Sequence, residues 1–421
     1  MTEKLYSTPI EEHEGRTFSP EELNILPAEE IAVGRRSYKR GEPPQGFVNR
    51  EDLGILVAER VKAQRVHAWP VPDGFAEPQR LCIAPNGDYI LGACVGAAHQ
   101  YGKSGKFNEI VLYRSDNKGA TWSGPVRPWE TSWSQHAFNP LVPRGSKRIY
   151  SFGTDFHPDH LVLPHNGAVS LRWSDDVGHN WSDPTFIKPA NAPHWTGVGH
   201  MQPYETAAGT WLIGTYHIIG KGPGERGDRQ HVLRSDDRGE SWTLIPEDGQ
   251  GWYLDPWDRM LEGIPIDLGH EIVFFTRTEE GHVWELRSTD DGLSWSAPAA
   301  TSLVHPDAPP MIFPLADGKT LVAFTHNKPA ASHHQDYHVR SELWVCTSAD
   351  GGRTWTDPRF LLANAAQPDR KGVGAVEVSY ADLLVDGEDL HLIFDHRKRQ
   401  VTHVHLKASD LDAFPTVDEL G

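Results

Sequence analysis

The sequence predicts an all-β protein of the six-bladed β-propeller class, with an N-terminal extension before the propeller. Three observations carry this prediction. An eight-residue pattern occurs five times, a glycine-marked pattern occurs six times, and turn residues are abundant, with 39 Gly and 32 Pro among 421 residues. Self-similarity at a fixed period is typical of repeat architectures, and in a propeller each repeat is one four-stranded sheet.

The first pattern, here called the Asp-box, reads Ser-x-Asp-x-Gly-x-(Thr/Ser/Asn)-Trp, and its first copy has Asn117 in place of the Asp. The copies begin 53 to 61 residues apart, at 115–122, 174–181, 235–242, 288–295 and 348–355. An Asp can accept bonds from backbone N–H groups, a Gly permits positive φ, and a Trp can pack against a sheet. We therefore predict that the Asp-boxes shape turns and perform no chemistry.

The second pattern is a strand-like run, a turn glycine and a second strand-like run, which together predict a β-hairpin. Six hairpins predict six blades, and their turn glycines are Gly87, Gly145, Gly209, Gly269, Gly318 and Gly387. No Asp-box follows the sixth hairpin, so a strand from within Ile55 to Trp69 is expected to close the ring and leave no free sheet edge.

The sequence thus divides into a wrapping extension, residues 1–50, and a six-bladed propeller, residues 51–421. Within the extension, Ser19-Pro-Glu-Glu22 has the capping-box spacing and predicts the start of one short helix.

Charge and composition exclude several classes of partner. The formal net charge of −18 argues against nucleic acid and against an anionic membrane, because both require basic surface. Met1 to Phe18 has no apolar core of the kind a signal peptide needs, and no segment approaches a membrane span in length, so a cytoplasmic location is expected. Cys82, Cys94 and Cys346 show no paired spacing, and we expect buried, reduced thiols.

Hairpin geometry selects the residues expected at the propeller face opposite the Asp-boxes. Glu262 lies seven residues before Gly269 and Arg277 lies eight residues after it, so both are expected at the same end of one hairpin. Tyr380 lies seven residues before Gly387, and Arg340 precedes the last Asp-box by eight residues. The other candidates for this face are Glu77, Arg80, His99, His136, His200, Gln202, Tyr216 and Arg397.

The candidate residues favour a sugar that carries a carboxylate. A guanidinium group binds a carboxylate through two parallel hydrogen bonds, and a Tyr beside a Glu can be activated as a nucleophile. With Glu262, Arg277, Arg340 and Tyr380 placed at one mouth, the chain resembles the sialidase (neuraminidase) superfamily of Asp-box propellers over roughly residues 70–410.

The resemblance implies a role for each of four residues. The segment 262–295 is similar to the one that carries the activating Glu and a carboxylate-binding Arg, and Ser379-Tyr-Ala-Asp-Leu383 is similar to the one that carries the nucleophilic Tyr. By this resemblance Tyr380 attacks the anomeric carbon with Glu262 as its base, and Arg277 and Arg340 hold the carboxylate.

Two features of the superfamily are absent. Phe75-Ala-Glu-Pro-Gln79 stands where an Arg-Ile-Pro motif would supply a first arginine, and Arg80 is a displaced substitute. The general-acid Asp is missing as well, because no Asp occurs between Asp88 and Asp116. His99 or Glu77 is then the candidate proton donor.

Three functions follow from these residues. The first is a sialidase-like glycoside hydrolase acting on a sialic-acid-like or uronic-acid sugar. The second is a uronate-specific lyase, in which a His or Tyr removes the C5 proton and arginine neutralises the carboxylate; the 23 histidines and the missing Asp favour it. The third is a non-catalytic carbohydrate-binding propeller. An anionic carbohydrate is the expected partner, and the sequence leaves the linkage and the oligomeric state open.

No cofactor is predicted. His157, His160 and His165 have a spacing compatible with a divalent metal, but a His-rich chain gives such spacing by chance. The sequence has no glycine-rich phosphate loop and no dinucleotide fingerprint.

Overall fold

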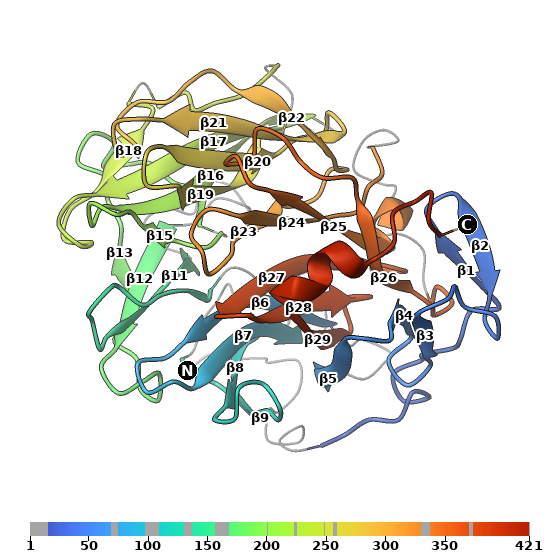
Figure 1. Cartoon of the computed structure of the whole chain (residues 1–421). Coiled ribbons are helices and arrows are strands. Elements are labelled where there is room, and N and C mark those ends of the chain that lie inside the picture. The colour runs from blue at the N-terminus through green and yellow to red at the C-terminus, as the bar shows by residue number, and fades with distance from the viewer. Residues whose placement is uncertain are drawn as a thin grey trace.

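The computed structural model describes residues 16–68, 75–96, 109–129, 137–155, 168–199, 201–222, 225–247, 249–255, 259–329, 337–369 and 374–420. Six antiparallel sheets surround a common centre (Figure 1), so the predicted six-bladed β-propeller is confirmed. Around the ring, strands of neighbouring blades contact one another, including β27 of the sixth blade with β6 of the first.

Blades 1 to 4 follow chain order, each from the inner strand to the outer strand. Blade 1 contains β6 (Phe75–Ile83), β7 (Tyr89–Gly96), β8 (Glu109–Ser115) and β9 (Ser123–Val126). Blade 2 contains β10 (Asn139–Leu141), β11 (Ile149–Asp155), β12 (Ala168–Ser174) and β13 (Thr185–Phe186). Blade 3 contains β14 (Val198–Gly199), β15 (Tyr204–Glu205), β16 (Trp211–Gly222), β17 (Glu225–Ser235) and β18 (Thr243–Ile245). Blade 4 contains β19 (Leu261–Asp267), β20 (Ile272–Arg277), β21 (His282–Ser288) and β22 (Ala299–Val304).

The last two blades contain strands from both halves of the chain. Blade 5 has β23 (Met311–Pro314), β24 (Leu321–Thr325), β25 (Glu342–Ser348) and β26 (Arg359–Asn364), followed by β4 (Ile55–Ala58) and β3 (Phe47–Arg50). Blade 6 has β27 (Val378–Asp386), β28 (Asp389–His396) and β29 (Gln400–Lys407), followed by β5 (Lys62–Ala68). The hairpin of β1 (Glu30–Val33) and β2 (Arg36–Lys39) and the 3₁₀ helices η2 (Tyr337–Arg340) and η3 (Ala408–Ala413) complete the named elements.

The ring is closed by an N-terminal strand, as the sequence predicts. The predicted strand is divided in two, because a tight turn in which the Val61 N–H donates to the Ala58 carbonyl redirects the chain. β5 pairs antiparallel with β29, from Ala68 opposite Gln400 to Lys62 opposite His405, whereas β4 pairs with β26 in blade 5. The strands before and after this turn therefore bind two neighbouring blades together.

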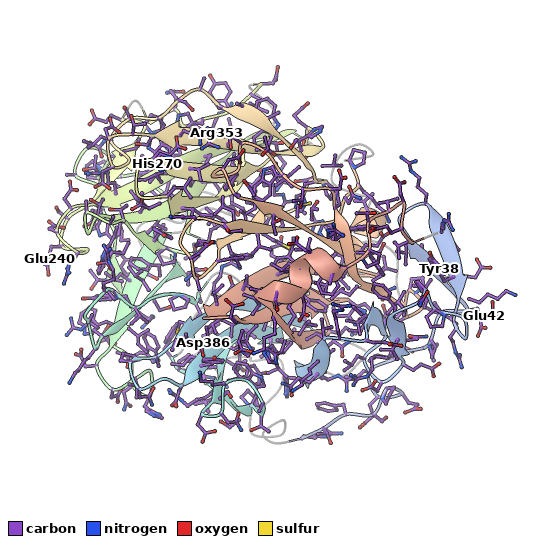
Figure 2. The ribbon with its side chains drawn as sticks, viewed as in Figure 1. Tyr38, Glu42, Glu240, His270, Arg353 and Asp386 are labelled. Carbon is purple, nitrogen blue, oxygen red and sulfur yellow. The ribbon has the colours of Figure 1, made fainter. Side chains whose placement is uncertain are left out.

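The Asp-boxes form turns as predicted. In the second Asp-box, the Asp176 carboxylate accepts bonds from the Asn180 N–H and the Ser174 hydroxyl, both at 2.8 Å, and Gly178 has a φ of 86°. Figure 2 shows Glu240, in the third Asp-box, at the edge of the molecule. The register fixes which end of a blade the Asp-boxes occupy, because Ser115 lies opposite Tyr89, whereas Glu77 pairs at the far end of β7.

The helix predicted from Ser19 is wrong. The capping hydrogen bonds form, since the Ser19 N–H donates to Glu22 Oε2 at 2.9 Å and the Glu22 N–H donates to Ser19 Oγ at 3.2 Å. Residues 20–24 nevertheless make only a turn. Asn24 has a left-handed φ of 51°, a conformation that commonly ends a helix, and Pro27 then bridges to Ala366.

The thiols of Cys82, Cys94 and Cys346 are buried and form no disulfide, in agreement with the prediction for these residues. Among the described residues, no helix has the length and apolar character needed to span a membrane.

Candidate functional site

Three inner strands carry a β-bulge in which two residues face one residue of the neighbouring strand. A bulge turns a side chain away from the regular alternation of a strand. The bulged pairs are Gln79 and Arg80 in β6, Glu262 and Gly263 in β19, and Tyr380 and Ala381 in β27. Glu262 and Tyr380 have φ values of 55° and 51°, which are uncommon for residues other than glycine and persist where the surroundings hold them.

Gly214 in β16 makes room for the bulge beside Glu262. A Cβ added at Gly214 would lie 1.8 Å from the backbone oxygen of Gly263, so the bulge would have to move. We predict that Gly214→Ala lowers the free energy of unfolding by about 1–3 kcal/mol or more, the usual cost of overpacking. Urea unfolding measures this loss. Gly41→Ala is the control, because its added Cβ meets nothing within 4 Å, and equal losses in both variants would contradict the prediction.

Glu262 and Arg277 lie together, as the hairpin spacing predicts. Arg277 pairs with Leu261 in the sheet, and Arg277 Nη1 lies 2.7 Å from Glu262 Oε2, with both side chains buried. The Tyr380 phenol interacts electrostatically with both groups: burial and the Glu262 carboxylate raise its pKa to about 12, although Arg277 and Lys398 act to lower it. The predicted Glu–Arg pair is therefore present, and its charges act on the Tyr380 phenol.

Lys398 is a central cation that the sequence analysis missed. It lies in the turn between β28 and β29, and its Nζ is 2.5 Å from Glu77 Oε2, 2.7 Å from Asp395 Oδ2 and 3.9 Å from the centroid of the Tyr380 ring. Glu377 Oε2 lies at 3.8 Å. Ammonium groups are attracted to aromatic ring faces. Lys398 thus links the candidate nucleophile to the acidic residues of blades 1 and 6.

The acidic groups around Lys398 hold protons unusually well. Burial raises the pKa of Asp395 to about 7 against the opposing effect of Lys398, and burial likewise raises the pKa of Glu77. Burial alone would lower the pKa of Lys398, but Asp395 and Glu77 outweigh it and raise that pKa. Two carboxyl groups that can retain a proton therefore lie beside a lysine that stays charged.

A second network joins three buried arginines. Arg277 Nε lies 2.5 Å from Asp307 Oδ1, Arg259 Nη1 lies 2.9 Å from Asp307 Oδ2, and Arg259 Nε lies 2.6 Å from Asp228 Oδ2. Arg340, at the end of η2, donates to the backbone oxygen of Asp307. Arg277 and Arg340 were predicted from the sequence, whereas Arg259 was not, although Arg259 precedes Glu262 by only three residues.

Comparison with known proteins identifies the family. Residues 95–392 match the model of the BNR repeat-like domain. This chain belongs to the BNR repeat-like domain family. None of the curated proteins compared with the sequence of this BNR propeller matches it.

Solved structures resemble this BNR propeller in fold. A Dyadobacter fermentans protein of unknown function has a TM-score of 0.60 at 16% identity, with 84% of this chain and 99% of that chain covered. The NanB sialidase of Streptococcus pneumoniae has a TM-score of 0.58 at 12% identity, with 84% and 71% covered. The Trypanosoma rangeli sialidase has a TM-score of 0.53 at 13% identity, with 82% and 56% covered. The chain is thus a sialidase-like BNR propeller, and these identities establish the fold alone.

Some of the other site residues predicted from the sequence are buried within the BNR propeller, and the rest lie outside the described residues. Arg80 Nη1 donates to the Gln79 carbonyl at 2.7 Å, and Gln202 Nε2 donates to the Pro140 carbonyl at 2.9 Å. Tyr216 is buried in an apolar cluster that includes Leu261. The residues that lie outside the described ranges are His99, His136, His157, His160, His165 and His200.

Arg397 does not join the Tyr380 constellation. Its Nη1 donates to the Asn24 carbonyl at 3.1 Å, and its Nη2 lies 3.1 Å from Asp369 Oδ1. The side chain of Arg397 therefore anchors the N-terminal turn. Among the residues that the structure describes, no group of His, Cys, Asp or Glu side chains is arranged to hold a metal.

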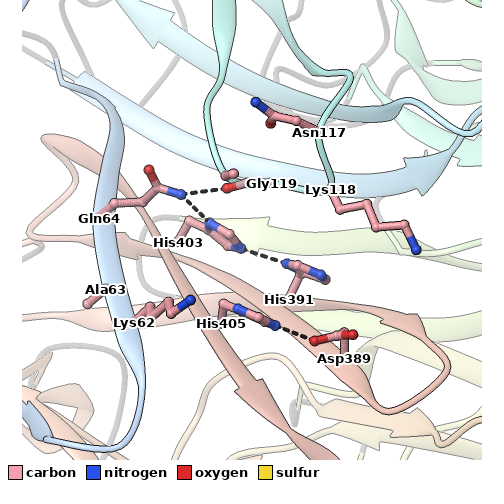
Figure 3. A pocket seen from close by; sticks show the side chains of 11 residues that line it. Lys62, Ala63, Gln64, Asn117, Lys118, Gly119, Asp389, His391, His403 and His405 are labelled. Atoms are coloured by element: carbon pink, nitrogen blue, oxygen red, sulfur yellow. Dashed lines mark hydrogen bonds and ion pairs between the residues drawn. The ribbon is translucent and has the colours of Figure 1, made fainter.

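A cavity of about 530 Å³ lies at the opposite, Asp-box end of this BNR propeller, between the first Asp-box and blade 6 (Figure 3). Gln64 Nε2 donates to the Gly119 carbonyl and to His403 Nδ1, so His403 Nε2 is the donor towards His391 Nδ1 at 3.1 Å. Burial lowers the pKa of His391 to about 4 and that of His403 to about 3. Neutral, stacked imidazoles thus fill the ring-closing junction, away from Tyr380 and Glu262.

Proposed function

We propose that this BNR propeller is a glycoside hydrolase that uses Tyr380 as its nucleophile and Glu262 as the base. The observation that carries this proposal is that Lys398 Nζ lies 3.9 Å from the centroid of the Tyr380 ring, while the charges of Glu262 and of its ion-pair partner Arg277 act on the pKa of the Tyr380 phenol. With a pKa of about 12, the phenol is protonated at neutral pH and is a weak nucleophile. An adjacent carboxylate that accepts the proton during attack removes this difficulty.

Each step of the proposed reaction has a group to perform it. The Tyr380 oxygen bonds to the anomeric carbon as its proton passes to Glu262, and the bond to the leaving sugar breaks. We assign the protonation of the leaving oxygen to Glu77, whose pKa burial raises, as a general acid requires. Water then cleaves the glycosyl–tyrosine bond, with Glu77 taking a proton from the water and Glu262 returning its proton to the Tyr380 oxygen, which regenerates the enzyme and retains the anomeric configuration.

A fold neighbour supports the covalent route. The Trypanosoma rangeli sialidase forms a covalent intermediate with 2,3-difluorosialic acid. A developing oxocarbenium ion, which is positively charged, would be stabilised by the single negative charge that Glu262 and Glu77 carry between them during these proton transfers. The sialic-acid-like or uronic-acid substrate expected from the sequence requires that Arg277 and Arg340 be available to a ligand carboxylate.

The test is a glycan panel analysed by mass, followed by a covalent trap. Hydrolysis adds one water for each bond cleaved, and a fluorinated analogue of the cleaved sugar is expected to leave its glycosyl group on a peptide that contains Tyr380. Elimination without added water would establish the lyase alternative instead. Binding to glycans without turnover of any would leave the non-catalytic alternative, and both results would overturn the proposal.

A further inference from the structure

We infer that the sugar ring accepted beside Tyr380 carries no carboxylate, because the chain's own Asp307 carboxylate already bonds to Arg277, one of the two arginines expected to bind it, and to the neighbouring Arg259. This inference names the substrate class of the proposed function and rests on it. One Asp307 oxygen contacts Arg277 and the other contacts Arg259, at 2.5 and 2.9 Å. Such a bridge between two guanidinium groups is the bonding that an incoming carboxylate would otherwise make.

Hydrogen bonds of the surrounding segment fix the position of Asp307. It lies in the segment between β22 and β23, in which the Ala308 N–H donates to the Pro306 carbonyl at 2.6 Å. The His305 imidazole bonds to the Pro309 carbonyl at 3.1 Å and to the Thr325 hydroxyl at 3.2 Å. The Arg340 guanidinium also donates to the backbone of Asp307. Moving the Asp307 carboxylate aside would break a buried ion-pair network and rearrange a segment fixed from both sides.

The charges around Tyr380 give an independent reason. The two networks contain four cations, Arg259, Arg277, Arg340 and Lys398, and six carboxyl groups, Glu77, Asp228, Glu262, Asp307, Glu377 and Asp395. Even if Glu77 and Asp395 are both protonated, the four cations and the four remaining carboxylates of these described groups sum to a net charge of zero. A ligand carboxylate would therefore meet no surplus positive charge here, and like charges in a buried site strongly disfavour binding.

The same arrangement suits an uncharged sugar. Carboxylates accept hydrogen bonds from sugar hydroxyls, and the groups in these networks are fixed by one another before a ligand arrives. The lack of surplus positive charge also matches the positive charge that develops at the anomeric carbon during glycoside cleavage. The substrate class is therefore a neutral glycoside, without a uronate or sialate group on the reacting ring.

The test compares binding of matched sugars in which a neutral hydroxymethyl or methyl ester group replaces the carboxylate. Methyl galactoside with methyl galacturonide, methyl glucoside with methyl glucuronide, and the methyl ester of N-acetylneuraminic acid with the free acid are titrated calorimetrically into the Tyr380→Phe protein. In at least one pair the neutral member is expected to bind about tenfold more tightly or better. Tighter binding of the charged member, or no binding in any pair, would overturn the inference.

A second arm uses Asp307→Asn, which keeps the shape and removes the charge. This change is expected to improve binding of the charged member by about tenfold and to leave the neutral member unchanged, whereas Asp307→Glu should keep the neutral preference. An unchanged ratio in a folded Asp307→Asn protein would refute the role of Asp307. If the Asp307→Asn protein does not fold, the inference is decided by the ratio of the neutral and charged sugars' affinities for the Tyr380→Phe protein, in which Asp307 is intact. Because only binding is measured, a neutral preference without turnover would refute the hydrolase proposal and leave this inference standing.

Discussion

Replacing Tyr380 by phenylalanine is expected to reduce glycoside cleavage by roughly a thousandfold or more, because the group that forms the covalent bond is lost while the ring and its contacts stay. The Lys398 ammonium can still lie over the aromatic ring, as it does at 3.9 Å from the centroid in the wild-type protein. The fold should therefore persist, with a melting temperature close to that of the wild type. The measurement is the single-turnover rate on the best sugar from the glycan panel.

Tyr113→Phe is the matched control for Tyr380→Phe. Tyr113 is a buried tyrosine of blade 1, and its hydroxyl has no hydrogen-bond partner among the described residues. Removing this hydroxyl should alter neither the rate nor the stability. If Tyr380→Phe cleaves glycosides at nearly the wild-type rate, direct attack by water replaces the covalent route, and the anomeric configuration of the product should then be inverted.

Replacing Lys398 by methionine is expected to have the largest effect on stability. The Lys398 ammonium group forms ion pairs with Glu77, Asp395 and Glu377, and the Lys398 side chain is 2% exposed. Removing one partner of a buried ion pair typically costs about 3–5 kcal/mol, since the other partner is left charged and poorly solvated. Urea unfolding at several pH values measures this loss.

The loss in Lys398→Met should depend on pH in a defined direction. Asp395 has a pKa of about 7 in the folded protein, above the 3.8 of an ordinary aspartate, and removal of Lys398 raises it further. A folded-state pKa above the unfolded value gives stability that is present at low pH and lost as pH rises through the folded pKa. The deficit relative to wild type should therefore be small near pH 5 and grow towards pH 8.

Lys118→Met is the control for Lys398→Met. Lys118 is 71% exposed and pairs with Asp386 at the surface, so its removal should change stability little at either pH. An equal loss for Lys398→Met at pH 5 and pH 8 would show that the missing interaction is not with titrating carboxyl groups.

The fold could be predicted because its signals are local and repeated. Each turn glycine fixes the register of one hairpin, so counting residues from Gly269 was enough to place Glu262 beside Arg277. The same reasoning failed at Ser19, where the capping residues are correct but a left-handed Asn24 ends the turn before a helix forms. A local signal predicts how an element starts and does not guarantee that the element continues.

The site was harder to predict because its charges come from distant parts of the chain. Glu77 and Lys398 form an ion pair although 321 residues separate them, and no periodicity in the sequence relates the two. The bulges that turn Glu262 and Tyr380 out of their strands likewise cannot be predicted from the alternation of apolar and polar residues along the sequence. Asp307 belongs to a connection between blades, and its role depends on the arginines that the propeller places around it.

The pairing of β5 with β29 has a consequence for synthesis of the protein. Lys62 leaves the ribosome roughly 340 residues before its partner His405. At about 5–20 residues per second, that interval lasts roughly 20 to 70 seconds, during which β5 has no strand to pair with. Blade 6 is therefore the last sheet that a nascent chain can complete. Cellular factors that shield strand edges would therefore matter most for β5.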